Sequence, residues 1–173
     1  MPKPTLRPKD SQNFWNFVLS VAFSCVLIVA MYEIWGKHGD FPHSIPLFDA
    51  LLLALASFRL TRLFVYDKIM RWFRELFVSK REVVKDGATW VEMLPADGIL
   101  RTGHDLLGCP WCIGFWSALV VTFLYFTFSW AWLVILFLAV AGAGSVMQIT
   151  ANAIGWTAEN LKLDAHRKEE TNR

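Results

Sequence analysis

The sequence has no Lys, Arg, Asp or Glu between Asp105 and Glu159. This uncharged stretch is long enough to form two transmembrane helices. Hydrophobic residues make up 55% of the 173 positions, and the mean hydropathy is +0.38. A water-soluble domain of this length rarely carries so much apolar surface, so the chain is predicted to be an integral membrane protein.

Net charge and cysteine are both scarce. A formal net charge of +2 is too small to suggest a nucleic-acid-binding protein, so no nucleic-acid partner is expected. The three cysteines, Cys25, Cys109 and Cys112, cannot all pair with one another. The chain is therefore not a secreted fold held together by disulfides.

The common catalytic patterns are also missing. The sequence has no paired-carboxylate, Ser/His/Asp, Walker or GxGxxG pattern, and no organic cofactor is predicted. Glu33 and Asp49 are isolated acids near the ends of apolar runs and are expected to be boundary residues rather than proton relays. These absences favour a non-enzymatic protein without excluding chemistry at the cysteines.

The pattern of apolar runs predicts an all-α membrane protein with about four transmembrane helices, an interfacial amphipathic helix and a small cytoplasmic cap. A signal peptide is the alternative for the first run, but that run is longer than a typical signal core and lacks a small-residue cleavage site.

The predicted segments are an arm at 1–13, spans at 14–35, 46–66, 110–128 and 131–156, an amphipathic helix at 67–78, a cytoplasmic loop at 79–108 and a tail at 157–173.

The loop at 79–108 supplies the predicted cap. Asp86 and Gly87 separate two short β-prone runs, which indicates a hairpin. Residues 95–98, with the sequence PADG, indicate a turn that leads the chain back to the membrane. The segment is too short to bury a core of its own, so it is expected to lie over the cytoplasmic ends of the spans.

Orientation follows from the distribution of cations. Of 17 Lys and Arg residues, only Lys37 lies in the loop between the first and second predicted spans, and none lies in the turn between the third and fourth. The remaining 17 − 1 = 16 therefore lie on the opposite side of the predicted membrane. The positive-inside rule then places both termini and the 79–108 loop in the cytoplasm, with the protein in the cell (inner) membrane.

Two features of the spans suggest helix packing. In the fourth span, Ala139 with Ala143 and Ala141 with Ser145 have the small-xxx-small spacing that lets helices approach closely. Gln148 and Asn152 lie four residues apart and are expected to hydrogen-bond a neighbouring helix.

Arg59 and Arg62 lie near the end of the second span and share a helical face. In the simpler interpretation, both side chains extend to the membrane surface. In the alternative, they form an electropositive site that packs toward the start of the third span, because arginine within a membrane normally faces protein or an anionic partner.

The motif Cys-Pro-Trp-Cys at 109–112 opens the third span. If Cys109 is the N-cap residue, Pro110 takes the first helical position, where its missing N–H is harmless, and Cys112 takes the third. The positive end of the helix dipole then favours thiolate at both sulfurs, and nearby arginines would add to this effect.

Three interpretations of Cys109 and Cys112 remain open. They could form a redox dithiol, or a metal site completed by His104 or by a second subunit, since two ligands alone are too few. Alternatively they are small packing residues beside Trp111 and Trp116. Cys25 is excluded as a further ligand because it lies roughly 18 Å along the first span.

The segments RLTRLFVYDKI at 59–69 and CPWCIGFW at 109–116 resemble a bacterial and phage family, domain of unknown function thirteen-sixty (DUF1360), with some members associated with sporulation. The resemblance covers roughly residues 48–155 and implies a small multi-spanning membrane protein. The sequence is therefore consistent with two functions. One is a scaffold or accessory protein that acts through its cytoplasmic face, and the other is a membrane thiol oxidoreductase. The expected partners are the lipid bilayer and either a second copy of the chain or another membrane protein.

Overall fold

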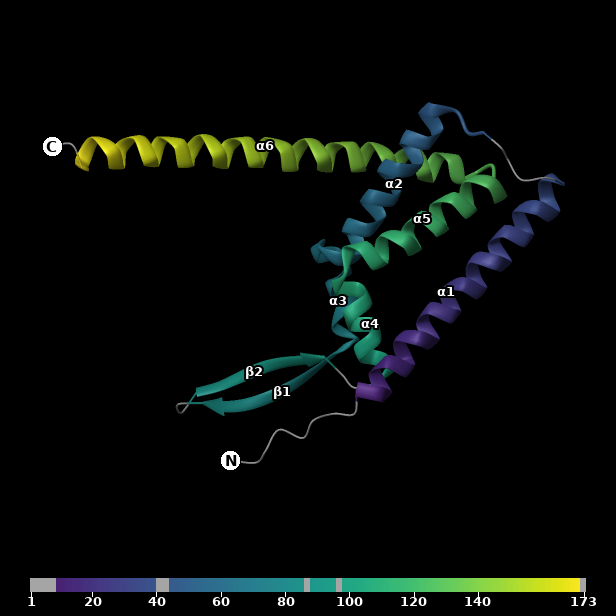
Figure 1. Ribbon diagram of the computed structural model, residues 1–173, viewed down its shortest axis with the longest axis horizontal. Helices are drawn as coiled ribbons and strands as arrows, with labels where there is room; N and C mark the ends of the chain where they lie inside the picture. The colour runs from purple at the N-terminus through teal and green to yellow at the C-terminus, as the bar shows by residue number, and fades with distance from the viewer. Residues whose placement is uncertain (1–8, 40–43, 86–87, 96–97, 172–173) are drawn as a thin grey trace.

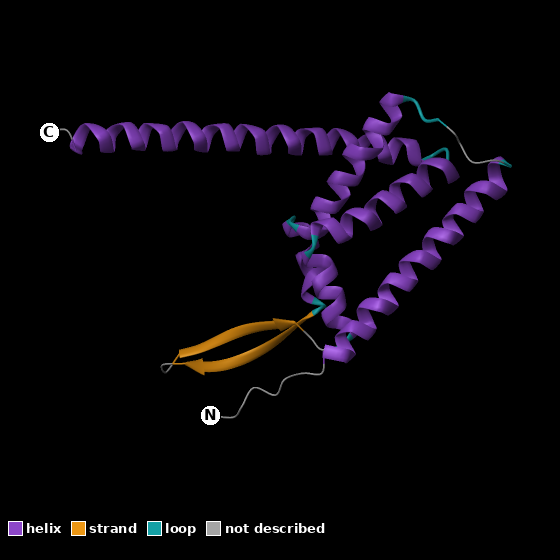
Figure 2. Cartoon of the chain, in the orientation of Figure 1, coloured by secondary structure: helices purple, strands orange, loops and turns teal. Residues whose placement is uncertain are grey.

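The computed structural model describes residues 9–39, 44–85, 88–95 and 98–171. The chain is mostly helical, with one two-stranded hairpin (Figures 1 and 2). The elements are α1 (Lys9–His38), α2 (Leu47–Val65), the 3-10 helix η1 (Lys68–Met70), α3 (Arg71–Glu75), β1 (Val78–Lys85), β2 (Ala88–Pro95), α4 (Ile99–Gly108), α5 (Pro110–Thr127) and α6 (Ala131–Thr171).

Three described helices are long and apolar enough to cross a membrane. They comprise Gln12–His38 in α1, Pro110–Thr127 in α5 and Ala131–Asp164 in α6. The remaining predicted span, the second at 46–66, corresponds to α2, whose nineteen residues include Asp49, Arg59 and Arg62. Length and composition therefore identify three of the four predicted spans as long, apolar helices. Whether α2 also crosses the membrane depends on how it packs against them.

The helix α2 occupies the centre of the bundle. It packs against α5 on one side and α6 on the other, while α1 lies against the far side of α5. Ala56 of α2 is fully buried in a core that also contains Val121 of α5 and three residues from the first turns of α6, Ala131, Ile135 and Ala139. The helix with the most protein around it thus carries three charged residues, Asp49, Arg59 and Arg62.

Small residues allow α2 and α6 to approach closely. A Cβ atom added at Gly142 would overlap the carbonyl oxygen of Leu55 in α2, whereas one added at Gly144 would meet nothing. Ala139 is also buried at this contact. The predicted small-residue face of the fourth span therefore packs on α2, with Gly142 at its tightest point.

The ends of three helices lie at one level. The Lys37 ammonium donates to the Thr127 carbonyl at 2.8 Å, and the Tyr125 hydroxyl donates to the Asp49 carboxylate. These contacts join the end of α1, the end of α5 and the beginning of α2. Consequently α1 and α5 run parallel and α2 runs opposite to both. Asp49 lies in the first turn of α2, at the predicted boundary, and its carboxylate is not isolated because it accepts a hydrogen bond from Tyr125 of α5.

The predicted amphipathic helix at 67–78 is divided into η1 and α3, and the chain is already extended at Val78. Its helical path breaks at Asp67, which has φ −71° and ψ 142°. Arg74 then donates to the Phe64 carbonyl at 2.7 Å and to the Asp67 carbonyl at 2.9 Å. Capping of the end of α2 by Arg74 folds this segment back and prevents one continuous helix.

The apolar residues of this segment divide between two environments. Phe73 packs edge-on against Phe64 and Phe77, with ring centroids 6.0 Å and 5.5 Å away. Ile69, Trp72 and Leu76 are exposed, as residues on a membrane surface would be.

The predicted hairpin is present as β1 and β2, which pair antiparallel from Val78 opposite Pro95 to Lys85 opposite Ala88. The predicted turns include residues 86–87 and 96–97, which lie outside the described residues. In Figure 1 the hairpin extends away from the helices instead of lying over them. Among the described residues of the 79–108 segment, α4 packs against α1 and α5.

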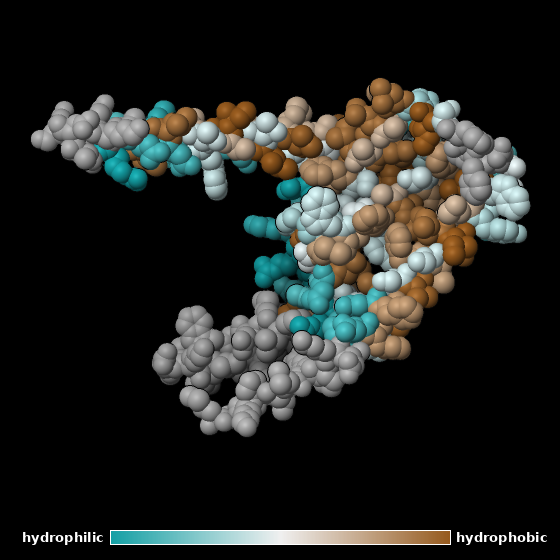
Figure 3. All heavy atoms as spheres, in the orientation of Figure 1, coloured by the Kyte–Doolittle hydropathy of each residue, from teal (hydrophilic) through white to brown (hydrophobic). Residues whose placement is uncertain are grey.

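The helix α6 continues far beyond the predicted span at 131–156. Its 41 residues would measure about 62 Å at the helical rise, twice the thickness of a bilayer core of about 30 Å. From Val146 onward its described side chains are exposed, and this half projects away from the other helices (Figure 1). Hydrophobic residues cover the α2 and α5 region of Figure 3, whereas hydrophilic residues gather toward α3, α4 and the far end of α6.

Candidate functional site at the start of α5

The backbone at the start of α5 has the predicted arrangement. Cys109 is the N-cap residue with φ −103° and ψ 103°, Pro110 begins the helix, and the Cys112 N–H donates to Cys109 Sγ at 3.3 Å. A sulfur atom here replaces the side-chain oxygen of a usual N-cap residue. Cys109 is half-buried and Cys112 is exposed, and both are free thiols.

This geometry changes the acidity of Cys109. A hydrogen bond from the Cys112 thiol, followed by one from the Cys112 backbone N–H, lowers the pKa of the Cys109 thiol below its ordinary value. Both bonds stabilise the thiolate, which is the nucleophilic form of cysteine. The start of α5 can therefore hold a reactive thiolate at Cys109 with a second thiol beside it.

Arg59 does not face this site. Its guanidinium pairs with the Asp67 carboxylate at 2.8 Å and donates to Ser145 Oγ of α6 at 3.3 Å. The expectation that Arg59 packs toward the start of the third span is wrong. The ion pair with Asp67 and the close contact with α6 turn it to the other side of α2.

Arg62 does face the start of α5. Together with Tyr66 it borders a cavity of about 710 Å³ that Pro110 and Trp111 line from the other side. The guanidinium carbon lies 5.9 Å from the Phe58 ring centroid and 5.2 Å from that of Tyr66. Within the described part of the chain, Arg62 Nε is buried without a hydrogen-bond partner. The two arginines therefore share a helix but have different neighbours.

The tryptophans of the motif region also separate. Trp111 is 83% exposed beside the cysteines, whereas Trp116 packs against Phe23 of α1 with centroids 4.9 Å apart. Trp111 therefore has the position of a membrane-interface residue, and Trp116 joins α5 to α1.

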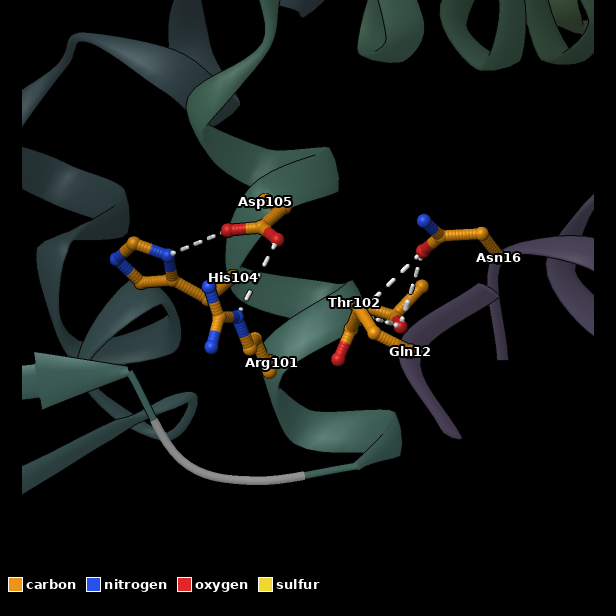
Figure 4. A network of polar contacts seen from close by, with 6 residues as sticks. All are labelled: Gln12, Asn16, Arg101, Thr102, His104 and Asp105. Atoms are coloured by element: carbon orange, nitrogen blue, oxygen red, sulfur yellow. Dashed lines mark hydrogen bonds and ion pairs between the residues drawn. The ribbon is translucent and has the colours of Figure 1, made fainter. Parts of the chain in front are cut away.

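His104 lies on α4 and its Nδ1 is 3.4 Å from the Asp105 carboxylate (Figure 4). It borders a second hollow with Arg71, Arg74 and Glu75. Among the residues that the structure describes, no group of three or more His, Cys, Asp or Glu side chains could hold a metal ion. A metal at Cys109 and Cys112 would therefore need further ligands from outside the described residues.

A polar contact between α1 and α4 was not predicted. Gln12 donates to Thr102 Oγ1 at 2.7 Å, and the Thr102 hydroxyl donates to Asn16 at 3.3 Å (Figure 4). Thr102 is buried. The four-residue spacing of Gln12 and Asn16 on α1 was the available signal, but nothing in the sequence identified their partner.

The comparisons with known proteins agree with the family resemblance. The chain is 38% identical over 72 residues to UPF0713 protein YngL of Bacillus subtilis (strain 168), a match covering 41% of this chain and 52% of that protein. It is 41% identical over 71 residues to sporulation protein YjcA of the same organism, covering 39% of this chain and 59% of that protein. The chain thus matches a little over half the length of these curated relatives.

No solved structure matches the chain. The family described as "Protein of unknown function (DUF1360)" matches residues 52–151, which run from α2 through both cysteines to the middle of α6. The first helix lies outside this region. The match covers more than half of the 173 residues, and the chain belongs to the DUF1360 family.

Proposed function

We propose that the chain is a four-span accessory protein of the cell membrane, with both termini and the β-hairpin in the cytoplasm. The proposal is supported by the parallel directions of α1 and α5, whose final turns meet at the Lys37 contact with Thr127. If both helices cross the membrane in the same direction, the chain must cross back between them. The helix α2 runs in that return direction and packs along α5.

An accessory role is carried by one observation, the free second half of α6. Within the described part of the chain, every side chain assessed from Val146 to Leu163 is exposed, and Ile154, Trp156 and Leu161 are large apolar residues among them. Apolar surface that extends beyond the thickness of the bilayer core would be exposed to water, and binding to another protein would cover it. A second copy of this chain is the first partner to test, and another membrane protein is the alternative.

Cross-linking at α6 tests this role. In a variant without native cysteines, Ala153→Cys should form a disulfide-linked dimer in native membranes, since Ala153 lies on the free half of α6. Val29→Cys is the matched control. Val29 also lies on an apolar helix, α1, and its side chain is 59% exposed. Equal cross-linking at both positions would indicate random encounters and contradict a partner surface on α6.

A second candidate function, membrane thiol oxidoreductase, is favoured by the lowered pKa of Cys109 beside an exposed Cys112. In that reaction the Cys109 thiolate attacks a disulfide of a substrate protein and releases one substrate thiolate. Cys112 then displaces the second substrate sulfur and leaves an oxidised Cys109–Cys112 pair, so that two electrons pass to the substrate.

Alkylation kinetics test this candidate. In a Cys25→Ser background, the rate of alkylation of Cys109 should rise with pH around a midpoint below the free-cysteine value of about 8.5. Cys112→Ala removes the side-chain donor and should raise that midpoint. A midpoint that is unchanged by this substitution, together with full function of the double serine variant in the cell, would leave the accessory role alone.

A further inference from the structure

The cavity between α2 and the start of α5 combines a cation with an apolar channel. Arg62 and Tyr66 from the last turn of α2 lie at one end, beside Pro110 and Trp111 from the first turn of α5. The remainder runs toward the middle of both helices and is mostly apolar, lined by Phe58, Gly114, Phe115 and Ala118 together with the hydroxyl residues Ser57 and Thr61. The lining is therefore polar at one end and mostly apolar toward the middle of the helices, as an amphipathic ligand is. The placement of the polar end at the membrane surface rests on the four-span arrangement proposed above.

The charge of Arg62 has no counter-ion within the described residues. The nearby Asp67 carboxylate is taken by Arg59 at 2.8 Å, and Arg62 rests on the rings of Phe58 and Tyr66. Its buried Nε also has no hydrogen-bond acceptor there. An unsatisfied buried donor costs free energy, and a planar guanidinium is suited to two parallel bonds with a phosphate group.

Gly114 keeps the apolar part of the cavity open. A Cβ atom added there would meet only Thr61 Oγ1, at 4.0 Å, so the backbone does not need glycine for packing. Thr61 is itself satisfied, because its hydroxyl donates to the Ser57 carbonyl at 2.8 Å. Space along Gly114 is therefore available to a chain lying against Phe115 and Ala118.

We propose that this cavity binds one anionic phospholipid, with the phosphate on Arg62 and an acyl chain along Phe58, Gly114 and Phe115. Charge complementarity selects the headgroup, because Arg62 is a cation without a described carboxylate partner. The depth of the apolar lining favours a lipid over a free anion. Trp111, exposed at the rim, suits the headgroup level of the bilayer. This inference depends on neither the partner of α6 nor the chemistry of the cysteines.

Lipid retention by the purified full-length protein tests the proposal. The protein would be reconstituted in phosphatidylcholine and phosphatidylglycerol at equal proportions, extracted in mild detergent, and analysed by native mass spectrometry. One phosphatidylglycerol should be retained per chain in preference to phosphatidylcholine. Arg62→Gln should reduce this retention by at least about tenfold, as expected for the loss of charge-assisted hydrogen bonds, and Arg62→Lys should restore part of it.

Two variants separate the site from general effects. Lys68→Gln removes one positive charge from an exposed residue just beyond α2, outside the cavity lining, and should retain the lipid. Gly114→Leu fills the channel without changing charge and should lose it. Circular dichroism and gel filtration of each variant restrict the comparison to folded protein.

Three results would overturn the proposal. Equal retention of the two lipids would show that no anionic site exists. Equal losses in Lys68→Gln and Arg62→Gln would indicate a diffuse surface charge. Displacement of the lipid by millimolar inorganic phosphate would identify an anion site rather than a lipid site.

Discussion

The helices α1 and α2 reverse the usual relation between hydropathy and burial. In α1 an uninterrupted apolar run forms a long helix at the edge of the bundle, and Ala30 and Ile34 are its buried residues within the described part of the chain. In α2 three charged residues interrupt a shorter run, yet this helix packs between α5 and α6. The more hydrophobic helix is therefore the more exposed one here, and charge is accommodated where other helices supply partners.

The largest expected effect is at the contact between α2 and α6. Gly142→Leu should destabilise the protein by about 3 kcal/mol or more, because its side chain would overlap the Leu55 backbone and separate the helices. Thermal unfolding in detergent, followed by circular dichroism, measures the loss. Gly144→Leu is the matched control two residues away, where a Cβ meets nothing. Equal stability of the two variants would show that α2 is not held tightly against α6.

An intermediate effect is expected at the charges of α2. Arg59→Gln or Asp67→Asn alone should cost about 1 to 3 kcal/mol, because each leaves the other charge without its partner in a site where both side chains are about a quarter exposed. The double variant should cost less than the sum of the single variants. A double-mutant cycle of thermal stability measures this coupling, and strict additivity would mean that the ion pair does not neutralise α2.

The smallest effect is expected at α1. Phe23→Ala removes the edge contact with Trp116 and should cost only about 1 kcal/mol, because α1 has few other contacts to disturb. Thermal unfolding in detergent measures the loss of stability, which is then compared with that of Gly142→Leu in the same assay. A loss as large as that of Gly142→Leu would make α1 part of the core and remove the contrast between the two helices.

Periodicity and composition predicted the helices well because long apolar runs and the proline after Cys109 act locally. Local sequence also determines three further features: the N-cap position of Cys109, the strands of the hairpin and the small residues along α6. The different neighbours of Arg59 and Arg62 were not predictable, since helical spacing alone places them on one face. Their separation arises from Asp67 and Ser145, whose positions depend on the break after α2 and on the path of α6.

Other errors have the same origin. The amphipathic pattern at 67–78 predicted one helix, but Arg74 folds back onto the final carbonyls of α2. Gln148 donates to Asn152 of the same helix at 3.0 Å instead of to a neighbour. Contacts between distant segments decide such details, and a single sequence contains no direct signal for them.

The crossing of the membrane by α2 is tested most directly by the accessibility of single cysteines in intact cells. In a variant without native cysteines, Ser44→Cys, Asp105→Cys and Ser129→Cys would each be exposed to a membrane-impermeant maleimide. If α2 crosses, positions 44 and 129 are labelled from outside and position 105 only after permeabilisation. Labelling of 44 and 105 together, with 129 protected, would mean that α2 stays on one side and would contradict the four-span arrangement.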